Sequence, residues 1–316
     1  MGIEISIIIP TRNEEDMIGN CLDAIKKSNF PQDKLEIILV DAYSEDKTRT
    51  IAESFSAKFY LEPKPCSPGG ARNFGAQKSK GNILIFLDAD QIVYADCISE
   101  IHGAFENKNI DAVIATELTK PFRQTFWSEI FFAEKVAAAQ KKKFTAATAY
   151  RRTVFEMLGG FDPKLGHAEV EELGHRFLST GHKQLFVESA KIIHDDPATF
   201  KEFFTECLWR GRTLLDPVSK IPRRALEYIA AMSLYFFVLP SVLVFLVTPF
   251  FSPLSIIASL ILLAFIIRSL QLIYSAVKGG AKKSASLFLP AYKILRGNFM
   301  ILGLFQRAWN KKKSKN

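Results

Sequence analysis

Two aspartates, Asp88 and Asp90, directly follow a run of five apolar residues in the stretch ILIFLDADQIV, residues 83–93. Two carboxylates one residue apart repel each other unless a positive charge lies beside them. Oxygen ligands favour Mg²⁺ and Mn²⁺, and in proteins such ions commonly bridge carboxylates and substrate phosphates. The spacing therefore predicts a divalent-metal site. The alternative interpretation is a pair of solvated loop acids that cap the next helix.

The segments that carry these acids alternate between two periodicities. Residues 4–9, 35–40, 57–61, 82–87 and 111–116 are predicted to be strands, and most are separated by segments with helical spacing. Apolar strands that alternate with helices predict a mostly parallel sheet with helices on both faces. Ligands bind at the carboxyl ends of the strands in such sheets. Asp41 and the Asp88/Asp90 pair are predicted to lie at such ends.

The chain changes character near residue 225. No charged residue occurs in 228–251, and 254–277 contains one, Arg268. About 20 apolar residues cross a bilayer, so these segments predict an α-helical transmembrane hairpin rather than the buried hairpin of a soluble core. Basic residues flank both ends of the hairpin, which predicts that both ends face the cytoplasm. They are Lys220, Arg223, Arg224, Lys278, Lys282 and Lys283.

Residues 286–305 are less apolar and contain Pro290, Lys293 and Arg296. We expect an amphipathic segment at the membrane interface here, because a third crossing would leave the basic tail KKKSK outside the cell. The predicted organisation is a cytoplasmic catalytic domain (1–215), a basic juxtamembrane linker (216–227), the hairpin (228–277) and a basic interfacial segment (278–316).

The composition bears on the class of partner. The net charge of +8 suits nucleic acid, an anionic membrane surface or a phosphorylated substrate, and of these we expect no nucleic acid as partner. The four cysteines are scattered and form no C-x-x-C pair, which predicts free thiols rather than a zinc site or a disulfide framework.

Further short motifs accompany the two aspartates in a fixed order: PTRNEE (10–15), DAYSEDKT (41–48), SPGGARNFGA (67–76), LDAD (87–90) and GGFDP (159–163). This ordered set, over roughly residues 3–215, resembles the family 2 glycosyltransferases. The resemblance implies a GT-A fold, a Rossmann-like sheet. It also implies an inverting, metal-dependent transfer of a sugar from a UDP- or GDP-sugar donor, with Mn²⁺ or Mg²⁺ as cofactor.

The resemblance also implies roles for individual residues. The nucleotide is expected to contact Pro10, Thr11, Arg12, Glu14, Asp41, Arg72, Asn73 and Asp88. The metal ligands are expected to be Asp88, Asp90 and His194. Arg210 and Arg212, in WRGRT, are expected to pair with the diphosphate, with an acceptor phosphate or with lipid headgroups.

One position departs from the family's pattern. The family's catalytic base is the Asp of an E-D pair, and alignment on Leu173 and Arg176 places Glu169 and Val170 there. Glu169 is the candidate base, or Glu171 or Glu172 if the register shifts. Alternatively no base is needed, because a polyprenyl phosphate acceptor is already anionic at neutral pH. The predicted hairpin favours a membrane lipid acceptor, either polyprenyl phosphate or a lipid-linked glycan.

Other functional classes fit the sequence less well. A nucleotidyltransferase or a dinucleotide-binding dehydrogenase needs a glycine-rich loop after the first strand, and PTRNEE contains no glycine. A catalytically decayed membrane scaffold of a glycan-assembly complex stays an alternative, with Val170 as its support. The aromatic-rich stretch 121–135 is expected to contact the membrane or to gate the acceptor.

Overall fold

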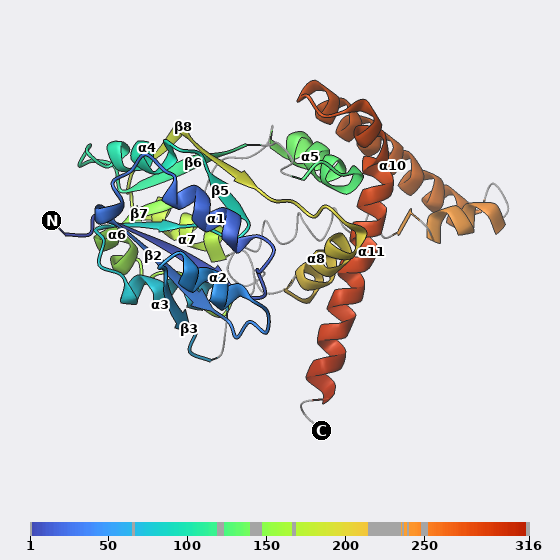
Figure 1. Cartoon of the computed structure of the whole chain (residues 1–316). Helices are drawn as coiled ribbons and strands as arrows, with labels where there is room; N and C mark the ends of the chain where they lie inside the picture. Colours follow the sequence, from blue (N-terminus) through green and yellow to red (C-terminus); the bar gives the residue numbers. More distant parts are fainter. Residues whose placement is uncertain are drawn as a thin grey trace. The chain divides into compact units, whose positions relative to one another are not determined.

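The computed structural model describes residues 2–64, 67–118, 123–139, 147–165, 169–213, 235, 237–238, 240–247 and 252–313 (Figure 1). The chain divides into two compact units. The first comprises Met1–Lys120 and Lys143–Asp195, and it contains the sheet. The second comprises Pro121–Lys142 and Asp196–Asn316, and its described parts are mainly helical.

The described residues form an eight-stranded sheet in the order β3-β2-β1-β4-β7-β6-β8-β5. Strand β1 pairs in parallel with β2 and β4, as do β2 with β3 and β6 with β8. Strand β7 pairs antiparallel with β4 and β6, and β5 pairs antiparallel with β8. The strands are β1 (Ile5–Thr11), β2 (Leu35–Asp41), β3 (Lys58–Leu61), β4 (Ile83–Phe86), β5 (Gln91–Val93), β6 (Ala112–Leu118), β7 (Ala149–Arg151) and β8 (Gln184–His194).

The five predicted strands are confirmed as β1, β2, β3, β4 and β6, with ends that differ by one or two residues. Strands β5 and β7 have three residues each, too few to produce a periodic signal. Strand β8 is long, but its mixed sequence QLFVESAKIIH leaves more than half of it outside the core. These three strands could not be recognised from apolar runs.

Helices cover both faces of the sheet, as predicted. The strand period of two sends Ile7 and Ile9 of β1 into one apolar cluster, with residues of α1 and α4. Ile8 points into another cluster, with residues of α6 and α7. The helices of this unit are α1 (Ile18–Lys26), α2 (Thr48–Ser54), α3 (Pro68–Lys78), α4 (Cys97–Ala104), α6 (Arg152–Met157) and α7 (Glu169–Ser179), with a short 3₁₀ turn at Gln32–Lys34.

The second unit contains α5 (Phe126–Ala139), α8 (Phe200–Thr213), α10 (Pro253–Lys278) and α11 (Lys283–Lys313). Helix α11 packs against α5, α8 and α10 (Figure 1). Two glycines allow the α8 and α11 backbones to approach closely. A Cβ atom on Gly211 would lie 1.9 Å from the carbonyl oxygen of Met300, and one on Gly303 would lie 2.2 Å from that of Leu208.

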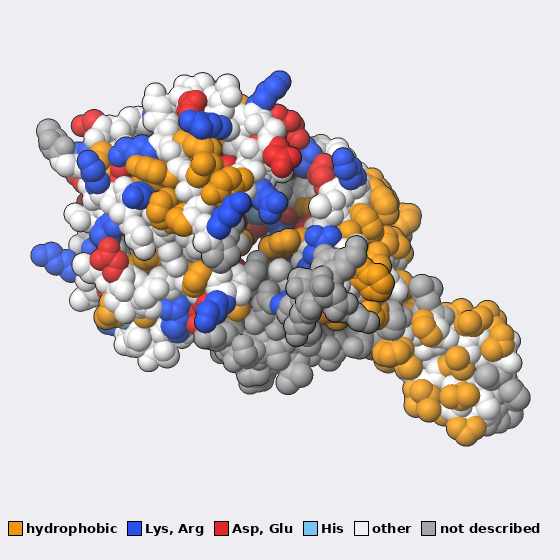
Figure 2. All heavy atoms as spheres, turned by 90° about the horizontal axis from the view of Figure 1, so that it is seen from below, with side chains coloured by type: hydrophobic (Ala, Val, Ile, Leu, Met, Phe, Trp, Pro, Cys, Tyr) orange, Lys and Arg blue, Asp and Glu red, His pale blue; other side chains and the backbone are white. Residues whose placement is uncertain are grey.

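Two described helices are long and apolar enough to cross a membrane: α10, with a mean hydropathy of 2.4, and Lys283–Trp309 of α11, with 1.2. The large apolar side chains on α10 are mostly exposed, and Figure 2 shows apolar side chains gathered on part of the helical unit. The predicted second span is therefore a helix, α10. Most of the predicted first span, 228–251, lies outside the described residues, and its part 240–247 is helical.

Residues 286–305, predicted to be interfacial, lie inside the continuous helix α11, which runs through Pro290. Its position at an interface stays a prediction. Cys21, Cys97 and Cys207 are free and buried, and Cys66 lies outside the described residues.

Candidate functional site

The carboxyl ends of β1 and β2 place Thr11 directly beside Asp41. The Asp41 carboxylate is 1% exposed. It accepts hydrogen bonds from Thr11 Oγ1 at 2.9 Å, from Ser44 Oγ at 2.5 Å and from the Ser44 amide at 2.8 Å. These bonds fix the orientation of Asp41 and tie the loop after β2 to the end of β1. Sequence reasoning missed Ser44, although it lies three residues after Asp41 in the motif DAYSEDKT.

The loops after β1 and β2 are also joined to each other. The Asn13 amide donates to Ser44 Oγ at 2.8 Å, and the Glu45 amide donates to Asn13 Oδ1 at 2.9 Å. Asn13 and Tyr43 adopt left-handed backbone conformations, with φ of +56° and +61°. Such conformations are costly for residues other than glycine and are frequent at functional sites.

The sheet register also brings Asp90 and His194 together. Gln91 of β5 pairs with His194 of β8, and the Asp195 amide donates to the Asp90 carbonyl at 2.9 Å. One side-chain ligand atom from each of Asp88, Asp90 and His194 lies within 4.8 Å of the others. His194 Nε2 lies 3.5 Å from Asp90 Oδ1. The structure thus gathers the three predicted metal ligands in one place.

The electrostatics of this cluster suit a divalent cation. Asp90 Oδ1 is buried and has no hydrogen-bond partner among the described residues. Burial raises the pKa of Asp90 to about 6, with Asp88 adding to the effect and His194 opposing it. Burial, followed by the charges of Asp90 and Asp88, raises the pKa of Glu14 to about 8. Crowded carboxylate oxygens with an imidazole nitrogen form a donor set that Mn²⁺ or Mg²⁺ accepts, so these residues fit such an ion.

Arg72 of α3 lies between two acids. Its Nη2 donates to Asp88 Oδ1 and its Nη1 to Glu169 Oε1, both at 2.6 Å. Arg72 is 6% exposed and Glu169 is 5% exposed. Burial works against the charged guanidinium, but Asp88 and Glu169 outweigh it and raise the pKa of Arg72. Burial likewise disfavours the charge of Asp88, yet Arg72 holds the pKa of Asp88 below its usual value. These three side chains form one continuous ion-pair network.

Asn73, the next residue, fixes the GGF turn. Its Nδ2 donates to the Phe161 carbonyl at 2.8 Å, and its Oδ1 accepts from the Phe161 amide at 2.9 Å. Gly160 is in the left-handed region, with φ of +69°, and a Cβ atom there would lie 2.5 Å from Asn73 Oδ1. The Arg72 guanidinium lies 5.5 Å from the centre of the Phe161 ring. The A-R-N and G-G-F motifs are therefore in direct contact.

The remaining predicted residues occupy varied environments. In the first unit, Pro10 is half-buried and Arg12 is exposed, and Val170 packs against an apolar cluster that includes Phe161 and Leu173. Glu172, an alternative base, forms an ion pair with Arg176 at 2.6 Å.

Arg210 and Arg212 lie on α8 of the second unit, where each has a partner. Arg210 pairs with Glu206 at 2.5 Å, and Arg212 donates to Gln306 at 2.7 Å. Their contact with a ligand stays a prediction.

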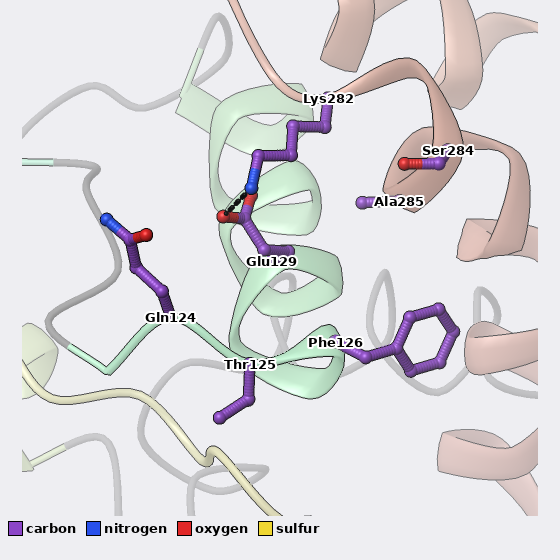
Figure 3. A pocket seen from close by; sticks show the side chains of 7 residues that line it. All are labelled: Gln124, Thr125, Phe126, Glu129, Lys282, Ser284 and Ala285. Carbon is purple, nitrogen blue, oxygen red and sulfur yellow. Dashed lines mark ion pairs between the residues drawn. The ribbon is translucent and has the colours of Figure 1, made fainter.

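A separate cavity of about 290 Å³ lies within the second unit, at the starts of α5 and α11 (Figure 3). Lys282 and Glu129 form an ion pair on its wall at 2.7 Å. None of the residues predicted to bind the nucleotide, the metal or the reacting groups lines it, but Gln124, Thr125, Phe126 and Glu129 belong to the stretch 121–135, whose contact with the membrane or the acceptor stays a prediction. The lining residues are Gln124, Thr125, Phe126, Glu129, Lys282, Ser284 and Ala285.

Comparison with known proteins gives a consistent result. Residues 6–156 match the family described as "Glycosyl transferase family 2". The probable glycosyltransferase YdaM of Bacillus subtilis is 29% identical over 231 residues, which cover 66% of this chain and 54% of that protein. The O-antigen chain rhamnosyltransferase RfbN of Salmonella typhimurium is 29% identical over 220 residues, or 64% of this chain and 69% of that protein. The chain thus spans about half the length of the first of these relatives.

Among solved structures, the mannosyltransferase PcManGT from Pyrobaculum calidifontis, in complex with GDP-Man and Mn²⁺, superposes with a TM-score of 0.57. The sequence identity is 17%, and the match covers 98% of this chain and 88% of that chain. This likeness establishes the predicted GT-A fold.

Proposed function

Because residues 6–156 match the family "Glycosyl transferase family 2", we propose that this chain transfers a sugar, with inversion, from a UDP- or GDP-sugar to a membrane lipid acceptor. The observation that supports this most strongly is the cluster of Asp88, Asp90 and His194, which contains a buried carboxylate oxygen that accepts no hydrogen bond from the described residues. Such a buried Asp90 oxygen, close to ligand atoms of Asp88 and His194, is suited to the metal complex of a sugar-nucleotide diphosphate.

Asp88, Asp90 and His194 would hold Mn²⁺ or Mg²⁺, which supplies positive charge for the departing nucleoside diphosphate. The residues at the ends of β1 and β2 would receive the nucleotide. Thr11 and Ser44 hold Asp41 in a single orientation, which would present a fixed hydrogen-bonding edge to the base or ribose. This ordering before binding lowers the entropic cost of donor recognition.

We infer a lipid acceptor from the second unit. Exposed Leu and Ile side chains cover α10, whose length and hydropathy suit a bilayer span. The basic residues that flank the predicted hairpin favour a cytoplasmic position for the catalytic unit. A polyprenyl phosphate is one suitable acceptor, since its phosphate is already ionised and attacks without a protein base; a lipid-linked glycan is the other.

Nucleotide binding by the full-length, detergent-solubilised protein tests the core of this proposal. UDP and GDP are titrated in the presence of Mn²⁺ and in the presence of a chelator. We expect metal-dependent binding of one nucleotide, abolished in Asp90→Ala and retained in Asp33→Ala, which removes an exposed acid from the turn before β2. Binding of neither nucleotide by the native protein would refute the transferase proposal and favour a non-catalytic scaffold.

The acceptor is tested separately, by transfer of radiolabelled sugar from the donor that binds. Label should appear on polyprenyl phosphate or on a lipid-linked glycan. Transfer to a water-soluble acceptor, with none to either lipid, would contradict the lipid part of the proposal while leaving the donor site intact.

A further inference from the structure

We propose that Glu169 is a positioning residue: by holding Arg72, it leaves the Asp88 carboxylate available to a divalent cation, and it does not deprotonate the acceptor. This inference rests on the proposed function and concerns the same site. It follows from the Asp88–Arg72–Glu169 network, because the two acids bind separate nitrogens of one guanidinium.

Competition for Arg72 is the basis of this role. Arg72 is nearly fully buried, and its ion-pair partners among the described residues are Asp88 and Glu169. A buried guanidinium needs a counter-charge in its low-dielectric surroundings. While Glu169 supplies one, Arg72 shares its charge between two carboxylates. If Glu169 lost its charge, Asp88 would be the remaining partner, and its carboxylate would bind Arg72 more strongly at the expense of a metal ion.

The charges around the cluster lead to the same conclusion. Asp88 and Asp90 contribute ligand atoms, and Glu14 interacts electrostatically with both. Arg72 places one positive charge against Asp88, and Glu169 offsets that charge from the far side of the guanidinium. Glu169 therefore keeps the site negative enough to attract a divalent cation without itself being a ligand.

The position of Glu169 is poorly suited to a general base. Its carboxylate is 5% exposed and already accepts a short hydrogen bond from Arg72. A base must lie within hydrogen-bond reach of the proton that it removes. Burial outweighs the charge of Arg72 and raises the pKa of Glu169, so its burial and its contact with Arg72, rather than its pKa, set it apart from a base. Glu169 lies at the start of α7, and the next residue, Val170, faces an apolar cluster and carries no ionisable group.

The test measures metal affinity rather than turnover alone. Mn²⁺ is titrated into the full-length protein at a saturating concentration of the nucleotide that the native protein binds, and the Mn²⁺ concentration for half-maximal nucleotide binding is determined. We expect Glu169→Gln to raise this concentration about 10- to 100-fold, the range typical of residues that orient metal ligands. Glu169→Asp, which keeps the charge, should raise it less.

Glu36→Gln is the matched control. It neutralises another buried acid of the same unit, paired with Lys58 instead of Arg72 and placed near the start of β2, so Mn²⁺ affinity should stay near the native value. The double variant Arg72→Gln/Glu169→Gln removes both charges. It should recover much of the Mn²⁺ affinity that Glu169→Gln loses, because no uncompensated guanidinium then binds Asp88. Circular dichroism and thermal unfolding check that each variant is folded.

The outcomes separate the two roles. A folded Glu169→Gln variant with native Mn²⁺ affinity but abolished sugar transfer would overturn the proposal and identify Glu169 as the base. Failure of the double variant to recover affinity would also count against it. If Glu169→Gln does not fold, the comparison of Glu169→Asp and the double variant with the native protein decides. Absence of metal-dependent binding in the native protein is a different result, which refutes the proposed function itself.

Discussion

Replacement of Asn73 by alanine should destabilise the catalytic unit through the GGF turn. The Asn73 side chain makes two hydrogen bonds to the backbone of Phe161, a residue that is 2% exposed. A buried polar group left without its partner costs about 1–3 kcal/mol. Loss of the side chain leaves both the amide and the carbonyl of Phe161 without these partners. We therefore expect a loss of about 2–4 kcal/mol, allowing for partial rescue of one group by water.

Hydrogen exchange at the Phe161 amide measures this effect locally. Each 1.4 kcal/mol corresponds to about a tenfold change in an equilibrium constant, so a loss of 2 kcal/mol accelerates exchange through opening by about 30-fold. Asn73→Asp keeps the acceptor for the Phe161 amide and loses the donor, so it should have a smaller effect on that amide. Asn298→Ala is the control, because its side chain donates to a carbonyl within its own helix, that of Ile294.

The GGF turn also links the stability of the first unit to the proposed donor binding. The ring of Phe161 lies beside the guanidinium of Arg72, so a loosened GGF turn should weaken metal-dependent nucleotide binding as well. Native exchange at the Phe161 amide in Asn73→Ala, together with a melting temperature no lower than that of Asn298→Ala, would refute this account of the turn.

Two further substitutions test the packing and the electrostatics of the fold. Gly211→Ala should lower the melting temperature and destabilise the protein by about 1–3 kcal/mol, because the added methyl group meets the Met300 backbone. Gly103→Ala is the control: its methyl group would meet nothing within 4 Å, so it should be neutral or slightly stabilising. Equal melting temperatures for the two variants would argue against close α8–α11 packing. Burial alone would raise the pKa of Glu36, but hydrogen bonds, foremost the one from Lys58, outweigh burial and hold the pKa below its usual value. The stability that Glu36 provides is therefore present above its unfolded pKa and is lost as pH falls through its folded pKa. The difference in melting temperature between the native protein and Glu36→Gln should stay constant above about pH 5 and shrink as pH falls from about 5 to about 3, and a difference that grows over this lower range would contradict the sign.

The sequence by itself determined the fold class of the first unit and the order of most of its strands. Long apolar runs such as ISIII and EIILV identify buried parallel strands, because both faces of such strands are covered. The ordered motifs predicted the family. The apolar run before Asp88 and Asp90 predicted that these two residues lie just beyond a strand. The uncharged stretch 254–277 was sufficient to predict the helix α10, since composition and length are local properties.

Tertiary structure decided which distant residues meet. The resemblance alone predicted His194 as a metal ligand, whereas the pairing of β5 with β8 shows why it lies beside Asp90. The same holds for Glu169, whose partner Arg72 is nearly one hundred positions away in the chain, a separation of 97 residues. No local pattern encodes this contact, because it depends on how α3 and α7 pack together. The role that we propose for Glu169 therefore follows from the folded chain, whereas the spacing of the two aspartates alone was sufficient to predict a divalent-metal site.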